Sequence, residues 1–148
     1  MATTEELVSE LSQVGDAAAF LKTHREDLHR QTLDEYLRSL MEARKLKVSD
    51  LAVSANFGDY LYKVCGGKRH PSRDALLAIV VGLRLAREDA AHVMRLAGYH
   101  EPDVRDARDA VILHGIEHGV GLDEVNTTLY ELGMDVLFDK TESVKHKA

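Results

Sequence analysis

Cysteine is almost missing from this sequence, because Cys65 is the single one among 148 residues. One thiol excludes an internal disulfide and every zinc motif built on paired cysteines, and it is typical of a reducing compartment. Long hydrophobic runs are missing too, since the longest, residues 75–83, is far shorter than the roughly 20 residues that cross a bilayer. No charged segment followed by an apolar one opens the chain, so we expect a cytoplasmic protein that does not enter a membrane.

Motifs of common catalytic sites are also scarce. The sequence has no glycine-rich phosphate loop, no nucleophile elbow and no paired-cysteine site, so we expect no enzyme activity, no cofactor and no bound metal. The string HGIEH at residues 114–118 matches the H-x-x-E-H pattern of one zinc-peptidase class. Because His114 continues an apolar helical line with Ala110 and Val111, we interpret it as a partly buried histidine and not as a metal ligand.

Positively charged residues are fewer than negatively charged ones over the whole chain. There are 19 Lys and Arg and 25 Asp and Glu, which gives a net charge of −6. This balance argues against a protein that coats polyanions without specificity. The distribution is uneven, however. Residues 33–75 hold eight Lys and Arg against six Asp and Glu, whereas residues 1–32 and 76–148 are both acidic. The positive excess therefore lies in one segment, as a local nucleic-acid surface requires.

Apolar residues recur at helical spacing along the chain, and a hydrophobic content of 45% is enough for one core. A capping box at Thr3 to Glu6 begins an N-terminal helical extension over residues 1–31. We expect this extension to pack on the main domain, with a dimerisation arm as the alternative. The run at 75–83 predicts a helix that is buried on most sides.

The C-terminal third predicts a helical hairpin over residues 100–138, followed by a flexible tail over 139–148. Its two helices are expected at 106–118 and 123–132, joined by a glycine-containing turn. The residues expected to face inward are Val125, Leu129, Leu132 and Leu137.

Residues 49–73 predict a helix-turn-helix. A short helix begins at Ser49, the chain breaks before Gly58, and a second helix of about residues 58–65 stops at two glycines, where a positive φ is least costly. The basic loop 66–72 follows this second helix. Such a motif lays its second helix in the major groove of DNA while neighbouring loops hold phosphates.

On these residues the chain resembles the bacterial Cro/phage-repressor-like, or XRE-type, helix-turn-helix regulators. The likeness runs from Tyr36-Leu37 to Tyr99, and its most specific part is the loop GGKRHPS at 66–72. The resemblance implies a five-helix, lambda-repressor-like domain, here residues 32–99, that binds double-stranded DNA as a homodimer. Residues 108–112 and 124–126 resemble the C-terminal extension of a subgroup of these proteins.

Candidate DNA-binding residues lie on the second motif helix and in the loop. Leu61 and Val64 fix the inner side of the helix, so Tyr62 and Lys63 are expected to point outward as groove contacts. The other candidates are Asp59, whose carboxylate would face phosphates unfavourably, and the cations Lys68, Arg69 and Arg73, which are expected to reach phosphate.

Two neighbouring residues are expected to serve the core. Tyr60 is predicted to pack under the motif, and Cys65 to act as a small apolar residue, with a redox switch as its alternative.

We therefore predict an all-α, sequence-specific DNA-binding transcriptional regulator. The alternative is a helix-turn-helix scaffold that binds a protein partner and no DNA. This alternative rests on the helix 59–64, which offers one cation, one carboxylate and two phenols in place of side chains that read base edges well.

Overall fold

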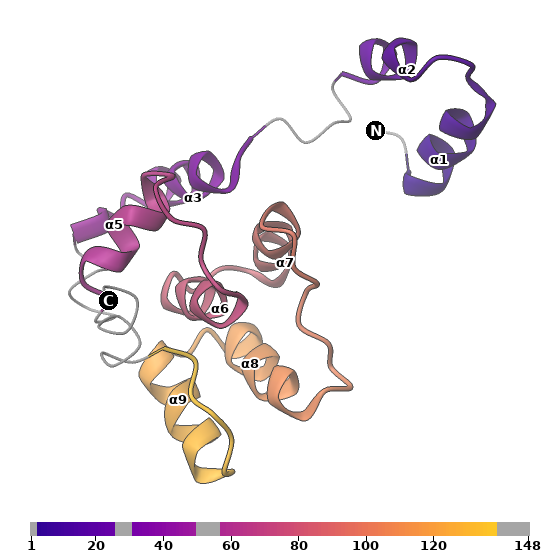
Figure 1. The fold of residues 1–148 in the computed structure, drawn as a ribbon. Coiled ribbons are helices and arrows are strands. Elements are labelled where there is room, and N and C mark those ends of the chain that lie inside the picture. Colours follow the sequence, from indigo (N-terminus) through magenta and orange to yellow (C-terminus); the bar gives the residue numbers. More distant parts are fainter. Residues whose placement is uncertain (1–2, 26–30, 50–56, 139–148) are drawn as a thin grey trace. The chain divides into compact units, whose positions relative to one another are not determined.

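The computed structural model describes residues 3–25, 31–49 and 57–138 (Figure 1). Within these ranges the chain forms helices and no strand, which confirms the predicted all-α class. The first helix of the predicted helix-turn-helix falls mainly on 50–56 and the predicted tail on 139–148, both outside the described residues. The described helices are α1 (Thr4–Gln13), α2 (Ala17–Thr23), α3 (Leu33–Ala43), α5 (Asp59–Cys65), α6 (Arg73–Gly82), α7 (Arg87–Leu96), α8 (Ala107–His118) and α9 (Leu122–Glu131).

The chain divides into two compact units, residues 1–31 and 32–148. In the first unit, Thr3 and Glu6 form the capping box that begins α1, each accepting a backbone hydrogen bond from the other. Phe20 of α2 is buried, whereas α1 has no buried side chain.

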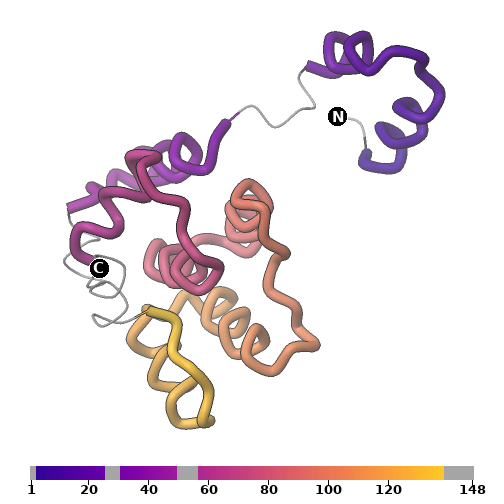
Figure 2. Tube along the Cα trace, viewed as in Figure 1, coloured from indigo at the N-terminus to yellow at the C-terminus, as the bar shows by residue number. Residues whose placement is uncertain are grey.

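Helix α6 lies at the centre of the second unit. Ser72 begins it by accepting a hydrogen bond of 3.2 Å from the amide of Ala75. Every side chain from Ala75 to Val81 is buried, which confirms the predicted central helix. Helix α6 packs against α7, α8 and α9, while α3 packs against α5 and α7 (Figure 2). One hydrophobic core therefore extends from α3 to the residues that follow α9.

Helices α8 and α9 follow each other after a short turn and pack closely. Gly119 ends α8 in the left-handed conformation, with a φ of 62°. A Cβ atom added at Gly115 would lie only 2.5 Å from Cγ2 of Val125, so glycine permits the close approach. The prediction that the side chain of Leu132 faces inward is wrong, since this side chain is 58% exposed. Leu132 is the C-cap of α9, and the chain leaves the helical line there.

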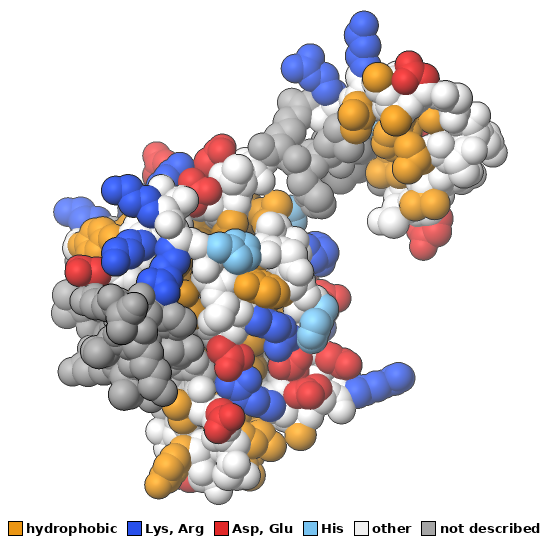
Figure 3. Space-filling view, viewed as in Figure 1, with side chains coloured by type: hydrophobic (Ala, Val, Ile, Leu, Met, Phe, Trp, Pro, Cys, Tyr) orange, Lys and Arg blue, Asp and Glu red, His pale blue; other side chains and the backbone are white. Residues whose placement is uncertain are grey.

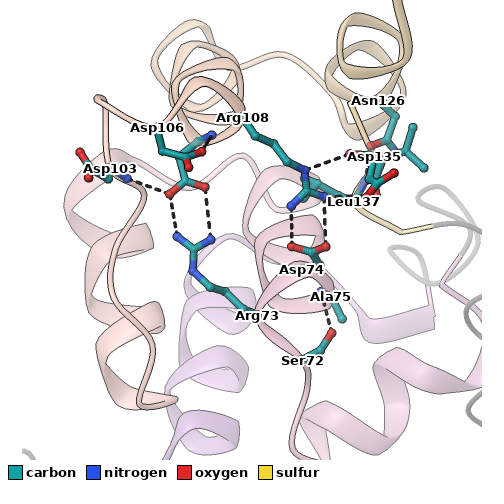
Figure 4. Close-up of polar contacts among 12 residues, drawn as sticks. Ser72, Arg73, Asp74, Ala75, Asp103, Asp106, Arg108, Asn126, Asp135 and Leu137 are labelled. Carbon is teal, nitrogen blue, oxygen red and sulfur yellow. Dashed lines mark hydrogen bonds and ion pairs between the residues drawn. The ribbon is translucent and has the colours of Figure 1, made fainter. Parts of the chain in front are cut away.

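Two Arg–Asp pairs connect the start of α6 to the start of α8 (Figure 4). Arg73 donates to both carboxylate oxygens of Asp109 at 3.2 and 2.9 Å. Arg108 donates to both carboxylate oxygens of Asp74 at 2.8 and 3.0 Å. Each helix supplies one arginine and one aspartate, and the two-point geometry is the strongest form of such a pair. We call these four residues the arginine–aspartate clamp.

The clamp lowers the pKa of the Asp109 carboxyl group. Burial, the largest influence on this carboxyl, raises its pKa, but hydrogen bonds from Arg73 and from the amide of Asp103 outweigh burial and leave the pKa below its usual value. The pKa of Asp109 is lower in the folded chain than in the unfolded chain. The stabilisation that the ionised carboxylate gives to the folded state is therefore fully present above the unfolded pKa of about 4. It is lost as the pH falls through the folded value.

We expect Asp109→Asn to lower the free energy of unfolding at pH 7 by about 2–4 kcal/mol, because Arg73 would keep its charge without a carboxylate partner. The difference from the wild type should shrink as the pH falls from about 4 towards the lower folded pKa, because the unfolded wild-type chain takes up a proton at Asp109 before the folded chain does. Urea unfolding followed by circular dichroism at several pH values measures both effects. The matched control is Asp106→Asn, which removes a carboxylate from the same turn and keeps a good N-cap. Equal losses in the two variants would contradict a specific role for the clamp.

A second prediction concerns the contact between α8 and α9. Alanine is favoured over glycine in a helix by about 1 kcal/mol. At Gly115, however, the new methyl group would collide with Val125, and overpacking of this kind costs about 1–3 kcal/mol. We expect Gly115→Ala to destabilise the wild type and to be better tolerated in a Val125→Ala background. A thermal-unfolding double-mutant cycle without such coupling would contradict the contact.

Candidate nucleic-acid interface

Helix α5 has one buried and one open side. Its buried residues are Tyr60, Leu61, Val64 and Cys65, which confirms the predicted core position of Tyr60. Asp59, Tyr62 and Lys63 are exposed, with 49% of Tyr62 accessible to solvent. The helix begins after Gly58, whose φ of 60° sets the direction of entry. The open side therefore carries a phenol, a cation and a carboxylate.

The basic loop folds back on the end of α5. Gly67 has a φ of 74°, and the carbonyl of Lys63 accepts hydrogen bonds from the amides of Lys68 at 2.9 Å and Arg69 at 3.2 Å. These bonds hold the backbone of the loop against the last turn of the helix. Lys63 and Lys68, both exposed, are thereby brought to the same end of α5.

Helix α3 supports this end of α5 through a residue that the sequence analysis missed. Arg38 donates a hydrogen bond of 2.8 Å to the carbonyl of Cys65, and its side chain is still 51% exposed. Arg38 also lies 3.5 Å from the carboxylate of Asp34, one turn earlier in α3. The spacing of these two residues is readable as a helical ion pair. The contact with Cys65 depends on how α3 and α5 pack, and no sequence signal indicates it.

The two remaining arginine candidates have partners within the domain, Arg69 on α5 itself and Arg73 on α8. The guanidinium of Arg69 lies over the ring of Tyr60, 5.2 Å from its centre, in a cation–π contact. Arg73 is a member of the clamp, and it also donates to the carbonyl of His100. The structure therefore brings Lys63, Lys68 and Arg69 to the end of α5 and turns Arg73 towards Asp109. A buried carboxylate is a stronger partner for a guanidinium than solvent, which explains this orientation.

The loop is also fixed at its other end. The hydroxyl of Tyr99 donates a hydrogen bond of 2.6 Å to the carbonyl of Pro71, and the rings of Tyr99 and His70 lie 5.7 Å apart. The loop is thus tied to the end of α5 on one side and to the residues after α7 on the other. Figure 3 displays several Lys and Arg side chains gathered over the α3 and α5 side of the domain.

The two histidines of the HGIEH string, His114 and His118, are both exposed on α8. His114 is exposed, so the prediction of a partly buried histidine is wrong; the inward side of α8 is formed by Ile112, Gly115 and Ile116 instead. The rings of His114 and His118 stack at 4.1 Å. Among the described residues, no three His, Cys, Asp or Glu lie close enough to hold a metal ion. No helix in the described ranges has the length and apolar character of a membrane span.

Cys65 is buried beside Met41, with the two sulfur atoms 4.0 Å apart. Burial raises the pKa of its thiol from 9.0 to about 11. Arg38 opposes this shift but does not cancel it. A buried thiol with a raised pKa behaves as an inert apolar side chain and not as a redox sensor.

We expect Cys65 to react with Ellman's reagent at pH 8 about 100-fold more slowly in the folded chain than in urea, because two pKa units lower the thiolate fraction by that factor. Burial should slow the reaction further. The absorbance of the released thiolate measures both rates. Similar rates in the two states would contradict the buried position and reopen the redox alternative.

Comparison with known proteins adds no relative. No protein-family model, no curated protein and no solved structure matches this chain. The geometry of α5, its loop and the clamp therefore carries the functional conclusion.

Proposed function

We propose that this protein is a sequence-specific DNA-binding transcriptional regulator that uses α5 as its recognition helix. The observation that supports this best is the open side of α5, where Tyr62 and Lys63 are exposed beside a loop whose amides bond to the helix end. In this proposal residues 32–99, to which α3, α5, α6 and α7 belong, form a lambda-repressor-like five-helix domain. The protein would act in the cytoplasm.

The exposed side chains suit different parts of a DNA duplex. The Lys63 ammonium can donate to guanine O6 and N7 in the major groove, and the Tyr62 hydroxyl can donate to or accept from a base edge or a phosphate. Lys68 and Arg69 are proposed to contact phosphates at the mouth of the groove. Arg38 extends this cationic end because half of its side chain is exposed beside Cys65. Arg73 is left out of the interface, since Asp109 holds its guanidinium.

A homodimer is part of the proposal, because one α5 of seven residues reaches only a few base pairs. Two copies related by a two-fold axis would place their recognition helices in successive major grooves, about 34 Å apart. The operator would then be a palindrome. Helices outside residues 32–99 are proposed to serve assembly or the sensing of an effector.

A second function is favoured by a separate observation. Arg73 is taken up by the clamp, Asp59 places an exposed carboxylate at the start of α5, and the chain carries a net charge of −6. Each of these features weakens attraction to DNA. The same open side, with Tyr62 at its centre, would then bind a protein partner.

The test is selection of bound fragments from genomic DNA, followed by fluorescence anisotropy at two salt concentrations. We expect Lys63→Ala and Lys68→Ala each to weaken binding about tenfold. Lys68→Ala, which removes a phosphate contact, should also reduce the slope of log K against log salt by about 1, whereas Lys63→Ala, which removes a base contact, should relax the sequence preference. The control is Arg105→Ala, which removes one positive charge from an exposed residue before α8.

The outcomes separate the two functions. If no fragment binds above background, or if Arg105→Ala weakens binding as much as Lys63→Ala, DNA recognition by α5 is contradicted. The protein-binding function then takes its place.

A further inference from the structure

A cleft of about 880 Å³ lies between α7, α8 and the connection that joins them. This volume falls within the range of about 300–1,000 Å³ typical of small-molecule sites. Figure 1 shows the connection from α7 to α8 passing well out from the two helices. The cleft belongs to neither α5 nor the basic loop, so it lies apart from the proposed DNA-binding side chains.

The apolar lining of the cleft comes mainly from the two helices. Ala90 and Ala91 of α7 contribute small side chains, and Leu113 and Ile116 of α8 contribute larger ones. The two adjacent alanines leave space between α7 and α8 that larger side chains would fill. An apolar lining gives an organic ligand a surface to bury.

The rim carries arginines that lack two-point partners among the described residues. Arg87, Ala91 and Arg95 follow each other at intervals of four residues and so share one side of α7. Arg95 makes a single contact of 3.7 Å with Glu101, and Arg87 one of 3.6 Å with Glu117. Both pairs join exposed side chains at long distance, and such contacts contribute little. Arg73 and Arg108, by contrast, each bind a carboxylate through two short bonds.

The outer wall of the cleft is fixed in place by the clamp. The amide of Asp103 donates a hydrogen bond of 2.9 Å to Asp109 (Figure 4). Arg73 also donates to the carbonyl of His100. Asp103 and His100 both line the cleft. A wall held by a buried ion pair gives a site that exists before the ligand arrives, which lowers the entropic cost of binding.

We propose that this cleft binds a small organic anion with one carboxylate and an apolar body. The carboxylate would replace Glu101 as the partner of Arg95 and bind its guanidinium at two points. The apolar body would cover Ala91 and Ile116. The lining holds three carboxylates, on Glu88, Glu101 and Asp103, against the two arginines, so a ligand has to displace Glu101 from Arg95 and can carry no more than one negative charge. This inference does not rest on DNA binding.

The probe is 8-anilinonaphthalene-1-sulfonate, an aromatic monoanion whose fluorescence rises in apolar surroundings, titrated into the full-length chain. Octanoate and octylammonium, which share a chain length and differ in charge, are then added as competitors. We expect octanoate to displace the dye and octylammonium to be at least tenfold less effective. Equal displacement by the two would overturn the requirement for an anion.

Variants locate the binding site. Arg95→Gln should weaken dye and octanoate binding at least fivefold, whereas Arg105→Gln, which removes a neighbouring arginine that does not line the cleft, should leave both unchanged. Ala91→Leu should fill the cleft and abolish dye binding. Leu132→Ser removes an exposed apolar side chain elsewhere and should have no effect.

Two further results would overturn the proposal: equal affinities in Arg95→Gln and Arg105→Gln, or loss of dye binding in Leu132→Ser. Circular dichroism confirms that each variant is folded. Should Ala91→Leu unfold the chain, the matched pair of glutamine variants still decides the question.

Discussion

The buried carboxylate of Asp109 is the constraint on which the second unit depends. It is the one charged side chain that is buried among the described residues, at 3% exposure. A charge in that position has to be compensated by hydrogen bonds, and its donors are the Arg73 guanidinium and the Asp103 amide. The backbone amide of Asp109 in turn donates to the carboxylate of Asp106, the N-cap of α8. The same carboxylate therefore fixes the start of α6, the start of α8 and the connection between α7 and α8.

This constraint also divides the arginines of the domain by role. Arg73 comes directly after the basic loop in sequence, yet its guanidinium serves the clamp. Arg38, which is distant in sequence from the loop, lies at the end of α5 with half of its side chain open to solvent. The cationic end of α5 is therefore composed differently from the basic string at residues 68–73.

Much of the fold could be predicted from local signals. Thr32 and Ser72 begin α3 and α6, as their positions before acidic and apolar residues indicate. The apolar run in α6 can be buried in only one way, at the centre of a helical bundle. Leu132 shows the limit of spacing as evidence, because it continues the apolar line of α9 but lies where the helix has already ended. The prediction that His114 is partly buried is wrong for a similar reason. The inward side of α8 is set by the residues that contact α6 and α9.

The sequence by itself determined the all-α class, the helix starts and the open side of α5, because caps and apolar spacing act between residues a few positions apart. Only the tertiary structure decided the partners of Arg73, Arg38 and Tyr60 and the presence of a cleft beside α7. Arg73 and Asp109 are 36 positions apart. Whether two such groups meet depends on helix packing, which no single segment encodes.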